Sequence, residues 1–200
     1  MFKLAGLIVL AAVQLGAFCV AAVTPDPLAP GSNFSVALTN LENAAAAFTS
    51  APFSESFPPN IPAYEGIFAL VKGCSDSYDA AGIQLAAFSP TISGGFLSAS
   101  NAARLNTTVP SIQGSILSRL NSLQAGKAFF ESVNNNLLLL NMYCHWIGNL
   151  SRETAFFLSI LRVGAPSADY ASSWSQLGAN AAFQYNILLT KDGFNCGSNP

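Results

Sequence analysis

The sequence predicts an all-α fold, an antiparallel bundle of five or six helices. Apolar residues recur every three or four positions in at least four segments, which is the spacing that lines one face of an α-helix. No segment shows a convincing apolar and polar alternation of the kind that marks a half-buried strand. Proline and glycine residues separate these segments by short connections, which favours helices packed side by side in alternating directions.

The first helix is expected after a proline-rich segment, where Ser32 or Asn33 can cap its N-terminus. It continues through an alanine-rich run that ends at Phe48, because alanine has the highest helix propensity. Residues 51–62 contain four prolines, which lack an amide proton and restrict the residue before them. This segment is therefore predicted to be a connecting loop.

The second helix, residues 63–88, has the clearest amphipathic pattern in the chain. Pro90 ends it, and Gly94 and Gly95 precede a short helical piece at 96–105. The apolar stripe of the second helix consists of Tyr64, Ile67, Phe68, Val71, Cys74, Tyr78, Ala81, Leu85 and Phe88.

The third long helix is expected to begin near Pro110 and to continue toward Phe129 and Phe130, before a turn at 134–136. Residues 137–150 are apolar on nearly every side, which is typical of a helix at the centre of a bundle.

The helix that starts in this apolar segment should continue until Gly164 and Pro166 stop it. A last helix is expected at 167–189. Its inward side is predicted to carry Tyr170, Trp174, Leu177, Ala181, Gln184 and Leu188.

Residues 1–22 have the pattern of a secretory signal peptide: one positive charge, an apolar run, and small residues up to Ala22. The alternative is a membrane anchor at 4–23, which is just long enough to span a bilayer. Cleavage would leave residues 23–200 as a single helical-bundle domain with an irregular proline-rich beginning, a flexible C-terminal tail and no transmembrane segment.

Three N-glycosylation motifs begin at Asn33, Asn106 and Asn149, and they agree with export through a eukaryotic secretory route. The C-terminal residues 191–200 are short and polar, so no lipid anchor is expected there. The product is predicted to be secreted, either extracellular or in the cell wall.

The mature chain keeps three disulfide candidates, Cys74, Cys144 and Cys196, which is an odd number for an oxidising compartment. The favoured interpretation pairs Cys196 with either Cys74 or Cys144 and leaves the other as a small buried hydrophobe. In the alternative, Cys196 forms a disulfide with another chain. Spacing alone does not decide the connectivity.

The composition argues against several functions. Charged residues make up 9% of the chain, with a net charge of −2 and no basic stripe, so nucleic acid is not an expected partner. A single histidine, His145, and few cysteines make a catalytic metal site improbable, and no cofactor is predicted. His145 is expected to be buried and hydrogen-bonded. No nucleophile motif is present, so the protein is predicted not to be an enzyme.

The aromatic content indicates a binding function instead. Fifteen phenylalanines in a chain that is 51% apolar exceed what a small bundle needs to close its core. Either a lipid-sized apolar cavity or an exposed apolar patch is therefore expected. The partner would be a hydrophobic surface or a lipid such as a fatty acyl ligand. Candidate ligand-binding positions on the helix stripes are Phe68, Val71, Ile116, Leu120, Phe157 and Ile160.

Three stretches resemble the fungal hydrophobic surface-binding protein family, which is similar to fungal cell-wall galactomannoproteins. They are SVALTNLENAAAAF, IPAYEGIFALVKGCSDSYDAA and VPSIQGSILSRLNSLQAGKAFFESV. The resemblance implies a secreted helical protein that adsorbs to hydrophobic surfaces or takes up acyl chains, with a secreted hydrolase or the cell wall as a further partner. The cysteines are not part of the family pattern.

The second functional hypothesis is a structural role. A silk-like or extracellular matrix subunit would be joined to a larger chain through Cys196, and it would need no ligand.

Overall fold

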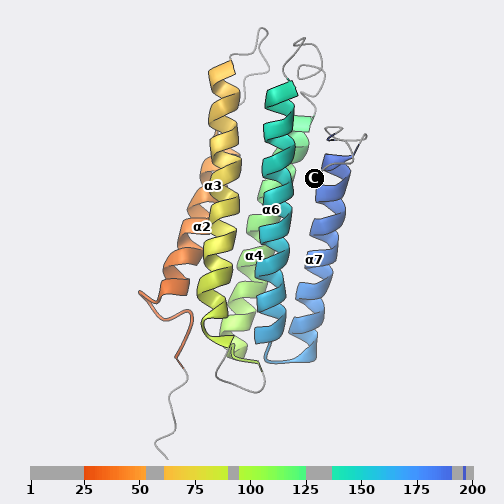
Figure 1. The fold of residues 1–200 in the computed structure, drawn as a ribbon. Helices are drawn as coiled ribbons and strands as arrows, with labels where there is room; N and C mark the ends of the chain where they lie inside the picture. Colours follow the sequence, from red (N-terminus) through yellow and green to blue (C-terminus); the bar gives the residue numbers. More distant parts are fainter. Residues whose placement is uncertain (1–24, 53–60, 90–94, 125–136, 191–195, 197–200) are drawn as a thin grey trace, which may run out of the picture.

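The computed structural model describes residues 25–52, 61–89, 95–124, 137–190 and 196, with only the backbone described at 61–64 and 137–140. The predicted signal peptide and most of the C-terminal tail lie outside these residues. Helices dominate the described part, and the all-α prediction is confirmed (Figure 1). The helices are α2 (Asn33–Ser50), α3 (Ile61–Ala86), α4 (Ala99–Gln124), α6 (Leu137–Gly164) and α7 (Ala168–Leu189).

The described helices form a closed ring. Going around it, α2 packs against α3, α3 against α6, α6 against α7, α7 against α4, and α4 against α2. Each helix runs opposite to the one before it in the chain, as expected for an antiparallel bundle (Figure 1). Because strict alternation is impossible around an odd-numbered ring, some spatial neighbours, such as α3 and α6, run in the same direction.

Large aromatic side chains fill the inside of this ring. The Phe157 ring on α6 lies 6.4 Å from that of Phe34 on α2 and 5.8 Å from that of Tyr78 on α3, measured between centroids. These contacts join helices from different sides of the bundle, so the apolar stripes of the sequence meet in one core. The largest fully buried side chains include Trp174, Tyr78, Tyr143, Tyr185, Phe34, Phe48 and Phe157.

The start of α2 follows the sequence expectation. Ser32 is its N-cap, and the Ser32 hydroxyl accepts a hydrogen bond from the Ser35 amide at 3.0 Å. Gly31 has a φ of +79°, a left-handed conformation that glycine adopts without steric cost. The chain can therefore turn sharply before the helix begins.

The loop prediction for 51–62 is wrong at its end, because α3 already begins at Ile61. Pro62 lies in the first turn, where a backbone amide has no acceptor within the helix and the missing proton removes no hydrogen bond. Residues 53–60 lie outside the described part. The predicted stripe of α3 is confirmed from Ile67 to Leu85, while Phe88 is half-buried in the turn after the helix.

The predicted break at Pro110 is also wrong. A single helix, α4, runs through this proline, and the separate helical piece expected at 96–105 is its first part. An internal proline costs about 3 kcal/mol. Burial of the continuous stripe on both sides of it, including Leu105, Val109 and Ile116, offsets that cost. The expected extension to Phe129 and Phe130 and the turn at 134–136 lie outside the described residues.

Helix α6 is not at the centre of the bundle, contrary to the prediction. It is one wall of the ring, between α3 and α7, and it exposes Asn141, His145 and Arg152 to solvent. These polar residues lie on one side of α6, and that side therefore faces solvent. Helix α7 matches its predicted range, with Ser167 as N-cap, although Tyr185 is buried and Gln184 is only half-buried.

The segment that leads into α4 packs closely against the end of α6, and glycines make this approach possible. A Cβ atom on Gly95 would lie 1.9 Å from the carbonyl oxygen of Ala165, and the Leu97 amide donates to the Gly164 carbonyl at 2.9 Å. The two backbone segments are therefore too close to admit a side chain.

Gly95→Ala should lower the free energy of unfolding by about 1–3 kcal/mol, since a backbone atom cannot move aside as a side chain can. The matched control is Gly114→Ala on α4, where a Cβ meets nothing within 4 Å. That variant should be about 0.5–1 kcal/mol more stable, because alanine favours helix. Urea unfolding midpoints check both, and equal effects in the two variants would contradict the close packing.

Candidate ligand-binding interior

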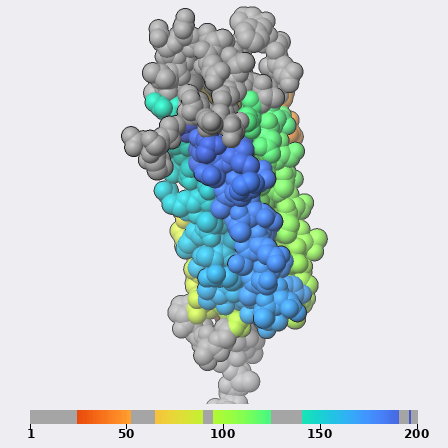
Figure 2. All heavy atoms as spheres, turned by 90° about the vertical axis from the view of Figure 1, so that its right-hand side faces the viewer, coloured from red at the N-terminus to blue at the C-terminus, as the bar shows by residue number. Residues whose placement is uncertain are grey.

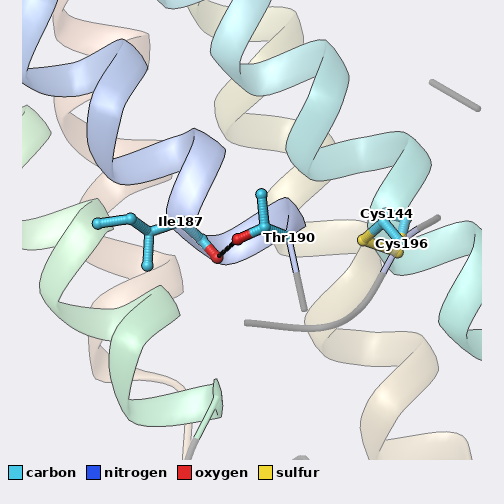
Figure 3. Close-up of a disulfide and its surroundings, with 4 residues drawn as sticks. All are labelled: Cys144, Ile187, Thr190 and Cys196. Carbon is cyan, nitrogen blue, oxygen red and sulfur yellow. Dashed lines mark hydrogen bonds between the residues drawn. A yellow bond between two sulfur atoms is a disulfide. The ribbon is translucent and has the colours of Figure 1, made fainter. Parts of the chain in front are cut away.

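The described cysteines form one disulfide and leave one buried thiol. Cys144 on α6 is bonded to Cys196, with an S–S length of 2.00 Å and a Cα–Cα distance of 5.5 Å (Figure 3). The Cys196 amide also donates to the Leu189 carbonyl at 3.0 Å, beside the end of α7. Cys74 is free and buried. The favoured pairing is confirmed, and the disulfide to another chain through Cys196 is wrong for this structure.

Four polar side chains from three helices meet inside the ring, and we call them the inner hydroxyl cluster: Cys74 and Tyr78 on α3, Thr154 on α6, and Tyr185 on α7. None of the four is more than 1% exposed. The Thr154 and Tyr185 hydroxyl oxygens are 3.4 Å apart. The cluster brings several hydrogen-bonding groups together within a mostly apolar core.

The surroundings of the inner hydroxyl cluster disfavour charge. Burial is the main cause that raises the pKa of Tyr78 and of Tyr185 above the ordinary value, and it raises the pKa of Cys74 to about 12. The Thr154 hydroxyl, which lies close to both phenols, opposes this rise. All members of the cluster are therefore uncharged at neutral pH.

Several polar atoms inside the ring have no hydrogen-bond partner among the described residues. They are the Tyr78 hydroxyl, the Gln113 side-chain oxygen and the Trp174 indole nitrogen, on α3, α4 and α7. Gln113 is 2% exposed and Trp174 is 1% exposed. A buried polar atom without a partner costs about 1–3 kcal/mol, and more than 90% of such atoms are satisfied in native proteins. These three atoms are therefore suited to bind a group that the described residues do not supply.

The structure brings most of the predicted ligand-binding positions into this interior. Phe68 packs edge-on against Tyr143 at 5.4 Å, and Phe157 contacts Tyr78. Ile160 is only half-buried and packs at the edge of the core. The positions that are no more than 2% exposed are Phe68, Val71, Ile116, Leu120 and Phe157.

The sequence pattern alone does not identify these polar positions. Tyr78 and Trp174 lie on predicted apolar stripes, where nothing distinguishes them from ordinary core residues. Thr154 and Gln113 fall among apolar residues at helical spacing, and a polar residue in such a place is the signal that could have identified them. Tyr185 is next to Gln184, which was predicted to face inward. The inward face of α7 is rotated by about one residue from the prediction, so Tyr185 is buried in its place.

The outer face of α6 carries a polar network. His145, which was expected to be buried, is exposed, and one ring nitrogen lies 3.0 Å from the Asn149 amide nitrogen. The Asn149 side-chain oxygen accepts from Arg152 at 3.1 Å, and Arg152 also pairs with Glu153. His145 is drawn outward because its neighbour Trp146 is the apolar member that packs against the core. The network is solvated and has no buried member.

The glycosylation motifs have different surroundings. Asn33 is exposed at the first residue of α2. Asn106 lies within α4 and is half-buried, and its side-chain oxygen accepts from the Ser173 hydroxyl of α7 at 2.9 Å. Asn149 lies within α6. A sugar is therefore accommodated most easily at Asn33.

A few large apolar side chains are exposed. On α7, Phe183 is 62% exposed, and the helix carries no charged residue from Tyr170 to its end. Figure 2 views α7 face-on between α6 and α4. The other large apolar residues that are exposed in the described part of the chain are Val36, Ile83, Met142 and Val163.

The buried Cys74 thiol should make the free energy of unfolding depend on pH in the alkaline range. Above about pH 9 the unfolded chain loses the Cys74 proton, while the folded chain keeps it up to about pH 12. The free energy of unfolding should therefore fall by about 1 kcal/mol between pH 9 and pH 10 because of this group, and stay constant below that range. Urea unfolding should show a smaller fall in Cys74→Ala. An unchanged fall in that variant would contradict the assignment.

Among the described residues, no group of three or more His, Cys, Asp and Glu side chains could hold a metal ion. None of the described helices combines the length and hydropathy that a membrane span requires.

No protein-family model, no curated protein and no solved structure matches this chain.

Proposed function

We propose that this is a secreted, non-enzymatic protein that binds lipid-type apolar ligands inside the helical ring. The observation that supports this most directly is the set of buried polar atoms without partners within an apolar interior. A purely structural core would do better with apolar groups at these positions, because each unsatisfied atom lowers stability. A ligand with an apolar body and a polar end would satisfy the Tyr78 hydroxyl, which lies near Thr154 and Tyr185.

The driving force would be the removal of apolar area from water. Each buried methylene contributes about 0.8 kcal/mol, so a chain of ~16 carbons needs no charged partner to bind, even after the cost of association. The proposed binding site is lined by buried positions on α3, α4 and α6. Among them, Val71, Ile116 and Leu120 are completely inaccessible to solvent. Helix separations in the ring would have to increase to admit such a chain.

The test is extraction of the full-length protein after expression with its own leader in a eukaryotic host. Organic extraction and mass spectrometry should recover a lipid in a near-stoichiometric amount, and a fluorescent fatty acyl probe should bind and be displaced by unlabelled lipid. An empty extract together with no probe binding would contradict the proposal. The secreted location is tested in the same preparation, because the mature protein should begin after Ala22.

A second candidate function is adsorption to a hydrophobic surface, as the family resemblance implies, with a hydrolase or the cell wall as partner. The exposed Phe183 favours it, because α7 carries no charged residue from Tyr170 to its end. Adsorption to polystyrene or alkane droplets should then weaken in Phe183→Ala and stay unchanged in Thr39→Ala, an exposed position on α2. Equal adsorption of both variants would contradict this role for α7.

A further inference from the structure

The inner hydroxyl cluster distinguishes between classes of ligand, and this inference rests on the proposed function. Its members present hydroxyl and thiol groups only, and no Lys, Arg or His belongs to it. The Tyr78 hydroxyl is completely buried and has no hydrogen-bond partner among the described residues. Phenol and hydroxyl groups can both donate and accept, so they match an oxygen of either kind.

A carboxylate would be poorly accommodated at this cluster. Moving an isolated charge out of water is far more costly than moving a hydroxyl, and only a paired opposite charge offsets that cost. The same desolvation already raises the pKa of Cys74 and of both tyrosines of the cluster. A ligand anion placed there would face the same penalty.

Arg119 is a cation that acts on a buried phenol, but that phenol is Tyr143 and lies outside the inner hydroxyl cluster. Arg119 on α4 lowers the pKa of Tyr143 on α6, against the larger effect of burial. Tyr143 precedes Thr154 by eleven residues on α6, which corresponds to about 16 Å along a helix. Arg119 also donates to the Ala51 carbonyl at the end of α2. The guanidinium is therefore engaged at a different level of the bundle from the inner hydroxyl cluster.

We propose that the inner hydroxyl cluster binds the polar end of an uncharged lipid that carries a hydroxyl or carbonyl oxygen, such as a long-chain alcohol, a sterol or an ester, in preference to a fatty acid anion. The Tyr78 hydroxyl donates to the ligand oxygen. Thr154 and Tyr185 lie beside it and complete the hydrogen bonding. The apolar body of the ligand lies among the surrounding core side chains.

The experiment compares three ligands of equal length, hexadecanol, hexadecanoate and hexadecane, delivered from cyclodextrin to the intact disulfide-bonded protein at about pH 8. Hexadecanol should bind at least about tenfold more tightly than hexadecanoate. Tyr78→Phe should weaken hexadecanol binding by about three- to tenfold and leave hexadecane binding unchanged, because one neutral hydrogen bond is lost. Thr154→Val, which keeps the side-chain shape, should act in the same direction.

The ligand-free stability of Tyr78→Phe provides a second readout that a merely structural tyrosine would not give. Removing an unsatisfied buried hydroxyl should raise the unfolding midpoint, although the same change weakens binding. The matched control is Tyr170→Phe, a half-buried tyrosine of α7, which should alter neither quantity.

Tighter binding of hexadecanoate than of hexadecanol, or hexadecanol binding that is unchanged in both Tyr78→Phe and Thr154→Val, would overturn this inference and leave the proposed function intact. Failure of all three ligands to bind the wild-type protein would overturn the proposed function, and this inference with it.

Discussion

Replacing Cys196 with serine should lower the free energy of unfolding by about 4 kcal/mol. The disulfide joins Cys144 and Cys196 across a sequence separation of 52 residues, and closing a loop of that length removes a large amount of entropy from the unfolded chain. The bond also attaches the residues after α7 to the wall formed by α6. Urea unfolding of the variant and the wild type, both without reductant, measures the difference.

The controls for this result remove the same Cys144–Cys196 disulfide in other ways. Cys144→Ser and the double variant should each match Cys196→Ser, because all three lack one and the same covalent link. Wild-type protein in dithiothreitol should unfold at a similarly reduced urea concentration. A loss below about 1 kcal/mol, or a double variant much less stable than either single variant, would contradict the intramolecular pairing.

Phe157→Ala should cost about 3–5 kcal/mol of stability, the usual range for deleting a fully buried phenylalanine ring. The Phe157 ring is inaccessible to solvent and contacts the rings of Phe34 and Tyr78, so its loss removes contacts between three helices of the ring. Thermal and urea unfolding provide the measurement.

The matched control is Phe183→Ala on the outer face of α7. The Phe183 side chain is 62% exposed, and its removal should change the free energy of unfolding by less than about 0.5 kcal/mol. Similar losses in the two variants would show that the inside and the outside of the ring have been assigned wrongly.

The helical periodicity of the sequence was enough to predict the fold class and most of the core. Position after position of the α3 stripe, from Ile67 to Leu85, is buried as expected. Local rules failed where tertiary packing opposed them. Pro110 predicts a break between two helices, but α4 continues through it because the apolar stripe is buried on both sides of the proline.

The candidate site could be predicted only in part. The apolar positions Phe68 and Phe157 follow from periodicity, since each lies on the buried side of its own helix. The inner hydroxyl cluster depends on how α3, α6 and α7 are aligned along the bundle, and a single sequence contains no information on that alignment. The contact between Thr154 and Tyr185, 31 residues apart, exists only after the helices pack.

The placement of α6 shows the same limit. Its first half is so apolar that composition predicts a central helix, whereas the few polar residues near Asn141, His145 and Arg152 are enough to orient it as a wall. The disulfide partner of Cys196 likewise required the geometry, because both candidate cysteines lie on helices with apolar faces.

A high-resolution crystal structure of the protein purified from its secreted form would decide whether the interior of the ring holds a lipid. We expect elongated density among the core side chains, with its polar end within hydrogen-bonding distance of the Tyr78 hydroxyl. Isolated water molecules beside Tyr78, Gln113 and Trp174, with no elongated density between the helices, would contradict it.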